Sequence, residues 1–373
     1  MNTVHVITGA TGFVGSAVVL ELLSQSDAPV VGIVRSREDA APVDRLRTTL
    51  HELVDAYEMD PELHAAIDAR VHAVAGNLWE SNCGVESLPV ESPEFWHCAA
   101  SLQYHDRHKT QIDQTNIRGT ANALDLAEKL DARVFNMVST AYVCGNQSGI
   151  IREERADAAL VNNHYEASKI EAEALVHESR LPSRVMRPGI VIGHSQTKHA
   201  LNYNGLYGFI RGLSKFARAL ERAQPGLARE LKVQLRADPD GGLGLVAVDH
   251  VAFEAAALSL ANAPEGIYHL TNPTPPSVGE TLDACFDAAG LRRPHYVPQG
   301  TELGSIDRKL QRSVDFYNSY IVREKSFDRS KVHAVLGERA LEGLEMPSSR
   351  LDAFCGWYAQ VLEQSHSATP VAR

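Results

Sequence analysis

The stretch that most constrains this chain is residues 4–15, which reads VHVITGATGFVG. Its apolar start predicts a buried strand, and Gly9, Gly12 and Gly15 then follow at the spacing G-x-x-G-x-x-G before a helix with an apolar face. A second apolar run, at residues 30–34, stands where a strand–helix–strand unit needs it. In such a turn the first glycine permits the tight bend, the second lets a pyrophosphate approach the backbone, and the third lets the helix pack closely on the strand. The stretch therefore predicts a dinucleotide-binding fold.

Length and composition limit the class of protein. With 373 residues, of which 44% are hydrophobic, the chain can bury a sizeable core in one or two domains. A formal net charge of −11 argues against a nucleic-acid partner, because phosphate contacts need a basic face. No run approaches the roughly 18 apolar residues of a membrane span, and no signal segment precedes the first strand, so we expect a cytoplasmic protein. The cysteines form no C-x-x-C pair, and His105 and His108 lack a third ligand, so we expect free thiols and no metal site.

The residues after the second predicted strand bear on the choice of cofactor. An NAD-preferring site usually places an acidic residue there, but this chain has Arg35. A guanidinium at this position, together with that of Arg45, favours binding of the 2′-phosphate of NADP. The alternative interpretation of these residues is a solvated loop of charges. Ala99 and Ala100 follow a further predicted strand and either let a nicotinamide ribose lie against the backbone or serve tight packing alone. We expect the cofactor to be NADPH.

The catalytic chemistry is predicted by a tyrosine and a lysine four residues apart. A strand at residues 133–138 delivers Thr140 at its carboxyl end, and Tyr165 and Lys169 then share one face of a helix. An ammonium group beside a phenol stabilises the phenolate, which supplies a poised acid for a reacting carbonyl oxygen, and a threonine hydroxyl can hold that oxygen. The pattern Y-x-x-x-K is common by chance, but after a glycine cradle and a strand-end threonine it indicates an active site.

These motifs resemble those of the extended short-chain dehydrogenases/reductases. The resemblance rests on residues 8–15, Asn116, Thr140, Tyr165 with Lys169, and the R-P-G sequence at 187–189. Residues 138–145 and 187–193 more closely resemble the fatty acyl-CoA reductases and the thioester-reductase domains that end carboxylic acid reductases and some peptide synthetases. The likeness extends over about residues 1–340.

The resemblance implies roles for individual residues. Thr140, Tyr165 and Lys169 would form the catalytic set, and Asn116 would support a water molecule or the lysine. Asn77 stands where the family usually has an acidic residue, which leaves the adenine contact open. The cofactor-binding residues expected from the motifs and the resemblance together are Gly9, Thr11, Gly12, Phe13, Val14, Gly15, Arg35, Arg45, Asn77, Leu78, Ala99, Ala100, Tyr165, Lys169, Pro188, Gly189, Ile190 and Val191.

We expect an α/β protein with two parts. A Rossmann doubly wound parallel sheet would occupy residues 1–193, with 240–272 returning to it, and a smaller mixed α/β substrate-binding cap would comprise 194–239 and 273–364, followed by a tail at 365–373. Residues 211–236 are basic, and they are either a solvated face or a docking face for an acidic acyl carrier protein or the phosphates of coenzyme A. The aromatic residues Tyr317, Tyr320 and Phe327 either line an acyl channel or fill the core.

The function that these expectations favour is NADPH-dependent reduction of an acyl thioester, bound to coenzyme A or to a carrier protein, to an aldehyde. Whether a second hydride then gives an alcohol is left open. One alternative is an extended short-chain reductase or epimerase that acts on a ketone or a sugar nucleotide. Another is a non-catalytic NADP-sensing regulatory protein, which the intact set of Thr140, Tyr165 and Lys169 disfavours. A homodimer is common in the resembled superfamily, but no residue pattern here demands one.

Overall fold

Seven parallel strands form the central sheet. The computed structural model describes residues 3–37, 40–103, 106–314, 318–321, 325–340 and 342–367. In this part of the chain the strand order is β11-β7-β5-β4-β1-β2-β3, and every neighbouring pair is parallel. The order reverses between β1 and β4, which opens a crevice at the carboxyl ends of the strands. The predicted doubly wound Rossmann sheet is confirmed; its strands are β1 (His5–Thr8), β2 (Val30–Val34), β3 (Val71–Ala75), β4 (Glu94–His97), β5 (Val134–Val138), β7 (Ser183–Pro188) and β11 (Gly266–Leu270).

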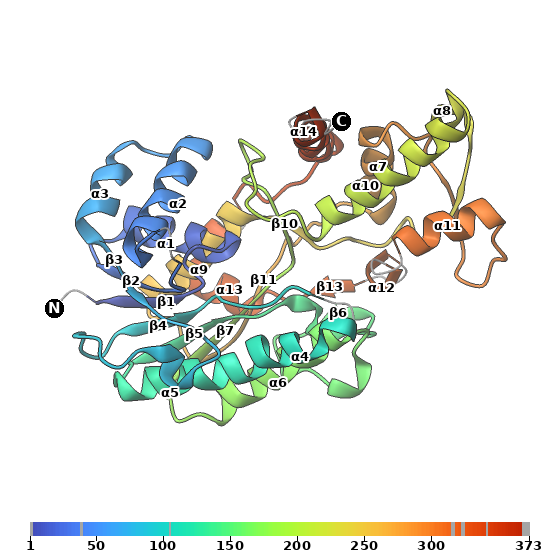
Figure 1. Cartoon of the computed structure of the whole chain (residues 1–373). Helices are drawn as coiled ribbons and strands as arrows, with labels where there is room; N and C mark the ends of the chain where they lie inside the picture. Colours follow the sequence, from blue (N-terminus) through green and yellow to red (C-terminus); the bar gives the residue numbers. More distant parts are fainter. Residues whose placement is uncertain are drawn as a thin grey trace.

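Helices cover both faces of this sheet (Figure 1). Burial on both faces explains why the strands read as continuous apolar runs and not as alternating patterns. The helices on one face are α1 (Phe13–Gln25), α2 (Pro42–Ala56), α3 (Glu62–Arg70) and α9 (Val248–Leu260). Those on the other face are α4 (Lys109–Ile112), α5 (Gly119–Lys129) and α6 (His164–Glu178).

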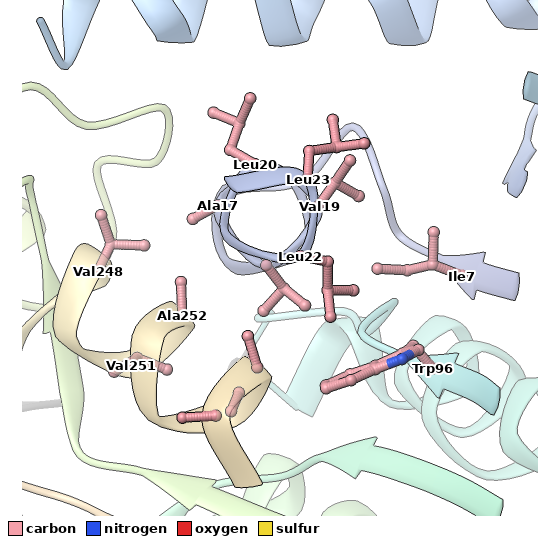
Figure 2. Packing of buried hydrophobic residues seen from close by; sticks show 14 of the residues in the cluster. Ile7, Ala17, Val19, Leu20, Leu22, Leu23, Trp96, Val248, Val251 and Ala252 are labelled. Atoms are coloured by element: carbon pink, nitrogen blue, oxygen red, sulfur yellow. The ribbon is translucent and has the colours of Figure 1, made fainter. Parts of the chain in front are cut away.

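Helix α1 is buried on more sides than the single apolar face that the sequence predicts. Figure 2 shows it surrounded by the side chains of β1 and β4 on one side and of α9 on another. Trp96 of β4 is fully buried beneath it, and α9 presents the small side chain of Ala252, which lets the two helices approach closely. Because the helix is buried nearly all round, its position relative to the strands is fixed by packing.

The cap is built around a second hydrophobic cluster. Phe209 and Leu213 on the inner face of α7 (Leu206–Ala223) belong to this cluster. Phe286 of α10 (Val278–Ala288) and Phe354 of α14 (Ser348–Ser367) belong to it as well. Strand β8 (Ile190–Ile192) pairs with β10 (Leu245–Ala247) where the chain passes between sheet and cap. The remaining cap elements are α8 (Leu227–Glu230), β9 (Gln234–Arg236), α10 (Val278–Ala288), β12 (His295–Val297), α11 (Ser305–Ser313), α12 (Asn318–Ile321) and α14 (Ser348–Ser367).

One part of the predicted cap lies with the sheet instead. Strand β13 (Lys325–Phe327) pairs with β6 (Gly149–Ile151), and α13 (Ser330–Leu336) packs on α9 and β11. Buried Arg329 explains this position, because its guanidinium donates to the Glu254 carboxylate of α9 and to the carbonyl of Thr271. The predicted cap range 273–364 is therefore wrong for this segment.

The end of the chain also differs from the prediction. Helix α14 continues to Ser367, so its last residues overlap the predicted tail at 365–373, and residues 368–373 lie outside the described residues. Tyr317 and His105, which the sequence analysis considered, are also outside them. Among the helices that the structure describes, none combines the length and the apolar character that a membrane crossing requires.

Candidate active site

A cavity of about 1140 Å³ lies at the carboxyl ends of the strands and continues between the sheet and the cap. It is lined at one end by the turn after β1 and at the other by α7 and α10 of the cap. Every residue predicted for catalysis or cofactor binding lines this cavity, with the exception of Asn116. The structure thus brings together residues that lie up to about 180 positions apart in the sequence.

Gly9 and Gly15 of the turn lie too close to neighbouring backbone atoms to carry a side chain. Gly9 has a φ of +75°, and a Cβ added there would lie 2.6 Å from the backbone nitrogen of Ala99. A Cβ on Gly15 would lie 2.2 Å from the carbonyl oxygen of Gly9. Gly12 caps the amino end of α1 without any side-chain hydrogen bond, so the first amides of the helix remain available to an anionic group. The turn therefore has the geometry of a diphosphate cradle.

Basic groups gather where the second strand ends. The side chains of Arg35 and Arg37 are exposed and line the cavity, and Arg45 lines it from α2. The Arg45 guanidinium donates to the carbonyl of Arg35, which holds the two residues together. Asp44, in the first turn of α2, lines the same region. Among the lining residues that the structure describes at this end, three carry a guanidinium group and one carries a carboxylate, and guanidinium groups are suited to bind a phosphate.

At the predicted adenine edge, Trp79 lines the cavity although the sequence analysis did not name it. The side chain of Asn77 is used within its own loop: its amide donates to Glu80 Oε1 at 2.9 Å, and its Oδ1 accepts from the backbone of Trp79 at 3.2 Å. Trp79 lines the cavity, is 47% exposed, and donates from its indole to Thr115 Oγ1 at 3.2 Å. The sequence feature that could have indicated Trp79 is a large aromatic residue directly after the predicted adenine edge at Asn77 and Leu78.

Thr140, Tyr165 and Lys169, the predicted catalytic residues, all line the cavity. Thr140 is buried at the end of β5, and its hydroxyl accepts from the backbone nitrogen of Tyr142 at 3.2 Å. Tyr165 lies in the first turn of α6, whose amino end is capped by Asn163. Lys169 follows one turn later, and its ammonium donates to the carbonyl of Val138 at 3.0 Å. The carboxyl end of β5 therefore positions both the threonine and the lysine.

Burial changes the proton affinities of these groups. It lowers the pKa of Lys169 to about 8, although the nearby Glu173 carboxylate opposes this shift. It raises the pKa of Tyr165, and the carboxylate of Glu166 raises it further. The described residues therefore favour the neutral phenol, which can donate a proton, and not the phenolate that the sequence analysis emphasised.

Asn116 acts on the site from outside the cavity. Its Oδ1 accepts from the backbone nitrogen of Ser101 at 2.7 Å, and its amide donates to the carbonyl of Ser101 at 3.1 Å and to Ser168 Oγ at 3.0 Å. These bonds tie the loop after β4 to α6 next to Lys169. In this arrangement Asn116 positions the loop that carries Ala99 and Ala100.

The conspicuous R-P-G sequence also has a positioning role in the structure. The guanidinium of buried Arg187 donates to both carboxylate oxygens of Glu173 on α6, at 3.0 and 2.6 Å. Ser139 Oγ donates to the same carboxylate. The pair fixes α6 against β7 and the end of β5 at the level of the catalytic residues. Pro188 and Gly189, which follow, line the cavity.

The cap side of the cavity is mainly apolar. Tyr320 lines it, and its hydroxyl donates to Glu166 Oε1 at 3.0 Å, whereas Phe327 packs against the ring of Tyr142 with centroids 5.7 Å apart. The polar residues on this side are Asn202, Asn204 and Thr281, in addition to Tyr320. The apolar ones are Leu206, Phe209, Leu243, Leu245, Leu282, Cys285 and Ile321.

The residues of the basic stretch at 211–236 differ in their exposure and in their contacts. Arg236 donates to the carbonyl of Thr301, and Glu221 accepts from the backbone at the start of α8. The exposed cations on the outer side of α7 are Arg211, Lys215, Arg218 and Arg222.

The sequence profile of a family described as "Male sterility protein" matches residues 7–252. The chain is 24% identical over 282 residues to a linear gramicidin synthase polypeptide of Brevibacillus parabrevis, and the match covers 72% of this chain and 5% of that protein. It is 26% identical over 201 residues to the chloroplastic fatty acyl-CoA reductase 2 of Arabidopsis thaliana, and that match covers 49% of this chain and 32% of that protein. The chain thus spans less than two thirds of either relative.

A solved structure shares the fold over nearly the whole chain. The terminal R domain from the myxalamid PKS-NRPS biosynthetic pathway superposes with a TM-score of 0.74 at 24% identity, over 97% of this chain and 91% of that one. This likeness supports the arrangement of sheet and cap described above.

Proposed function

This chain belongs to the male sterility protein family, as an extended short-chain dehydrogenase/reductase of the thioester-reductase-like type, and on that basis we propose that it reduces an acyl thioester to an aldehyde with NADPH. One observation carries the proposal: a single cavity joins the glycine turn, the Thr140, Tyr165 and Lys169 side chains, and an apolar wall of the cap. A cofactor and an acyl group can therefore meet at the three polar side chains.

The glycine turn and the basic end of the cavity fit a phosphorylated dinucleotide. The amides at the start of α1 would hold the diphosphate, and Arg35 with Arg37 would hold a 2′-phosphate on the ribose. Asp44 lies at the same end and would repel that phosphate, but among the described lining residues the guanidinium groups of Arg35, Arg37 and Arg45 outnumber it. When bound, NADPH supplies the hydride for the reaction.

The proposed catalytic residues can bind the thioester carbonyl oxygen and donate a proton to it. Thr140 and Tyr165 would hold the thioester carbonyl oxygen, and the neutral phenol would give this oxygen a proton as the carbonyl carbon is reduced. Lys169 would stabilise the tyrosinate that remains, because its charge lies one helical turn away. Collapse of the hemithioacetal then breaks the carbon–sulfur bond, returns a proton to the sulfur and releases an aldehyde and a free thiol.

The cap wall favours a neutral, apolar acyl group. Leu206 and Phe209 from α7 and Leu282 from α10 contribute to it, and no Asp, Glu, Lys or Arg lines the cap side within the described residues. A charged acyl tail would lose its hydration there without gaining a counter-ion. We therefore expect faster reduction of a medium-chain fatty acyl thioester than of one whose tail ends in a carboxylate.

The experiment follows NADPH oxidation with acyl-CoA and acyl-carrier thioesters, and with free ketones in parallel. Thioester-dependent oxidation with release of a stoichiometric thiol supports the proposal, whereas turnover of ketones alone contradicts it. Tyr165→Phe should abolish turnover and keep NADPH binding, because it removes only the proton donor. Unchanged turnover in this variant would rule out the proposed mechanism.

The outer face of α7 is proposed as the docking surface for an acidic acyl carrier protein. Arg218 and Arg222 are exposed on this face, while Phe209 on the opposite face lines the cavity. A carrier bound there would be separated from the apolar wall of the cap by the thickness of α7. Changing both arginines to Glu should raise KM for the carrier-bound substrate in a salt-dependent manner, while Arg180→Glu, on an exposed loop after α6, serves as the control. An unchanged KM would refute the surface.

A further inference from the structure

Two thiols of the cap lie in contact beside the cavity. Cys285 of α10 and Cys355 of α14 have their sulfur atoms 3.9 Å apart, and both side chains are 0% exposed. The two helices pack against each other within the cap cluster. The sulfur atoms of a disulfide are about 2 Å apart, so closure requires a movement of roughly 2 Å shared between two side chains, which small thiol rotations and helix shifts can provide.

The two thiols differ in access. Cys285 lines the cavity next to Thr281 and Leu282, whereas Cys355 does not line it. Because both side chains are fully buried, a small reagent in the cavity reaches the pair only when the wall opens locally, and it then reaches the cavity-lining Cys285 before Cys355. Of the five cysteines, all of which lie in the described part of the chain, only these two have a contact between their sulfur atoms.

We propose that Cys285 and Cys355 form an oxidation site in the substrate cavity, at which a peroxide converts the two thiols into an intramolecular disulfide between α10 and α14. Cys285 sulfur attacks one peroxide oxygen, the O–O bond breaks, and a sulfenic acid and water form. Cys355 sulfur then displaces the hydroxyl group from this sulfenic acid, which leaves as a second water. Both sulfur atoms are oxidised, and both peroxide oxygens are reduced to water.

The surroundings of Cys285 set the conditions for this reaction. Burial raises the pKa of the Cys285 thiol, and the contact with Cys355 raises it further. The thiolate is the reactive form, so oxidation should be slow near neutral pH and accelerate as the pH rises. An acyl group that occupies the apolar wall would cover Cys285, so substrate should protect the pair.

The first test measures the disulfide directly and needs no turnover. The reduced, folded protein is treated with hydrogen peroxide, with or without octanoyl-CoA, and its peptides are mapped by mass spectrometry without reduction. We expect a linked pair of peptides that contain Cys285 and Cys355, less of it with octanoyl-CoA, and its disappearance after dithiothreitol. Sulfinic acid at Cys285 without linkage, or a linkage through the cavity-lining Cys98 instead, would overturn the proposal.

Variants separate the two steps. In Cys355→Ser the sulfenic acid at Cys285 should persist and be trapped by dimedone, whereas Cys285→Ser should give neither the adduct nor the linkage. Cys83→Ser changes a buried thiol elsewhere in the core and should still form the linkage. A dimedone adduct on Cys355 in the Cys285→Ser protein would contradict the assigned order of access.

The consequence for catalysis rests on the proposed function. A disulfide draws Cys285 towards α14 and reshapes the apolar wall of the cap. Oxidation should therefore cause a severalfold loss of octanoyl-CoA reduction, which dithiothreitol should reverse. The Cys355→Ser variant should not show this loss. If the disulfide forms and no thioester is reduced under any condition, the oxidation site stands and the proposed function fails. If thioesters are reduced and no disulfide forms, the proposed function stands and the oxidation site fails.

Discussion

Gly15→Ala is the substitution whose effect follows most directly from the structure. The third glycine of the turn lies in the first turn of α1, where an added Cβ would come within 2.2 Å of the carbonyl oxygen of Gly9 and 2.8 Å of its carbonyl carbon. Both atoms are backbone, so neither can rotate away. The Gly9 turn cannot retreat easily either, because it already lies against the backbone of Ala99. The helix or the turn must therefore move.

The magnitude can be estimated from two opposing effects. Overpacking of this kind costs about 1–3 kcal/mol. Alanine has a higher helix propensity than glycine, which returns about 1 kcal/mol. We expect the free energy of unfolding to fall by up to about 2 kcal/mol. We also expect a displaced turn to cost about 1.4 kcal/mol of NADPH binding free energy, which corresponds to a tenfold loss of affinity.

A second glycine supplies the matched control. Gly356 lies within α14, and a Cβ added there meets nothing within 4 Å. Gly356→Ala should therefore gain about 0.5–1 kcal/mol of stability from helix propensity alone. Urea unfolding followed by tryptophan fluorescence gives the stabilities, and fluorescence titration gives NADPH affinity. If Gly15→Ala matched Gly356→Ala in stability and bound NADPH normally, the reasoning about the cradle would be refuted.

Three further changes test other parts of the site. Because burial lowers the pKa of Lys169 to about 8, its charge is present below that pH and lost above it, so kcat/KM should fall as the pH rises through 8, and Lys169→Met should abolish this dependence together with most activity. The unfolded chain binds more protons than the folded one between pH 8 and the ordinary lysine value of 10.5, so unfolding free energy in this window should rise with pH more steeply than in Lys169→Met. Glu173→Gln should lower the unfolding free energy by about 3–5 kcal/mol, measured in urea, because it leaves the buried guanidinium of Arg187 without its counter-charge. Arg35→Ala should raise the Kd of NADPH about tenfold and leave that of NADH unchanged, as expected for the loss of one charge-assisted phosphate contact, and equal losses for both cofactors would contradict the assignment.

Local patterns sufficed for the cofactor half of the molecule. The turn between β1 and α1 depends on close contacts among Gly9, Gly12 and Gly15, which are near neighbours in sequence, so their spacing already indicates the geometry. The spacing of Tyr165 and Lys169 likewise determines their common helical face. The predicted sheet followed from apolar runs separated by helical patterns, because parallel strands buried on both faces must read in that way.

The proton affinities at the site could not be predicted in the same manner. The neutral state of Tyr165 depends on burial by segments far away in sequence and on the carboxylate of its neighbour Glu166. The position of Lys169 depends on the carbonyl of Val138, 31 residues earlier. A sequence pattern shows which groups are adjacent along a helix, but desolvation is decided by everything that packs around them.

The cap shows the same limit more strongly, since its contacts join distant segments. Arg329 is held with the sheet by Glu254, 75 residues away, and no periodicity in the intervening chain indicates that bond. The hydroxyl of Tyr320 donates to Glu166, which lies 154 residues earlier in the sequence and directly follows Tyr165, the proposed proton donor. The acyl wall and the proton donor are thus connected through one buried carboxylate. Because such contacts exist only in the folded chain, the apolar acyl group that we propose from the lining of the cavity could not be inferred from the sequence.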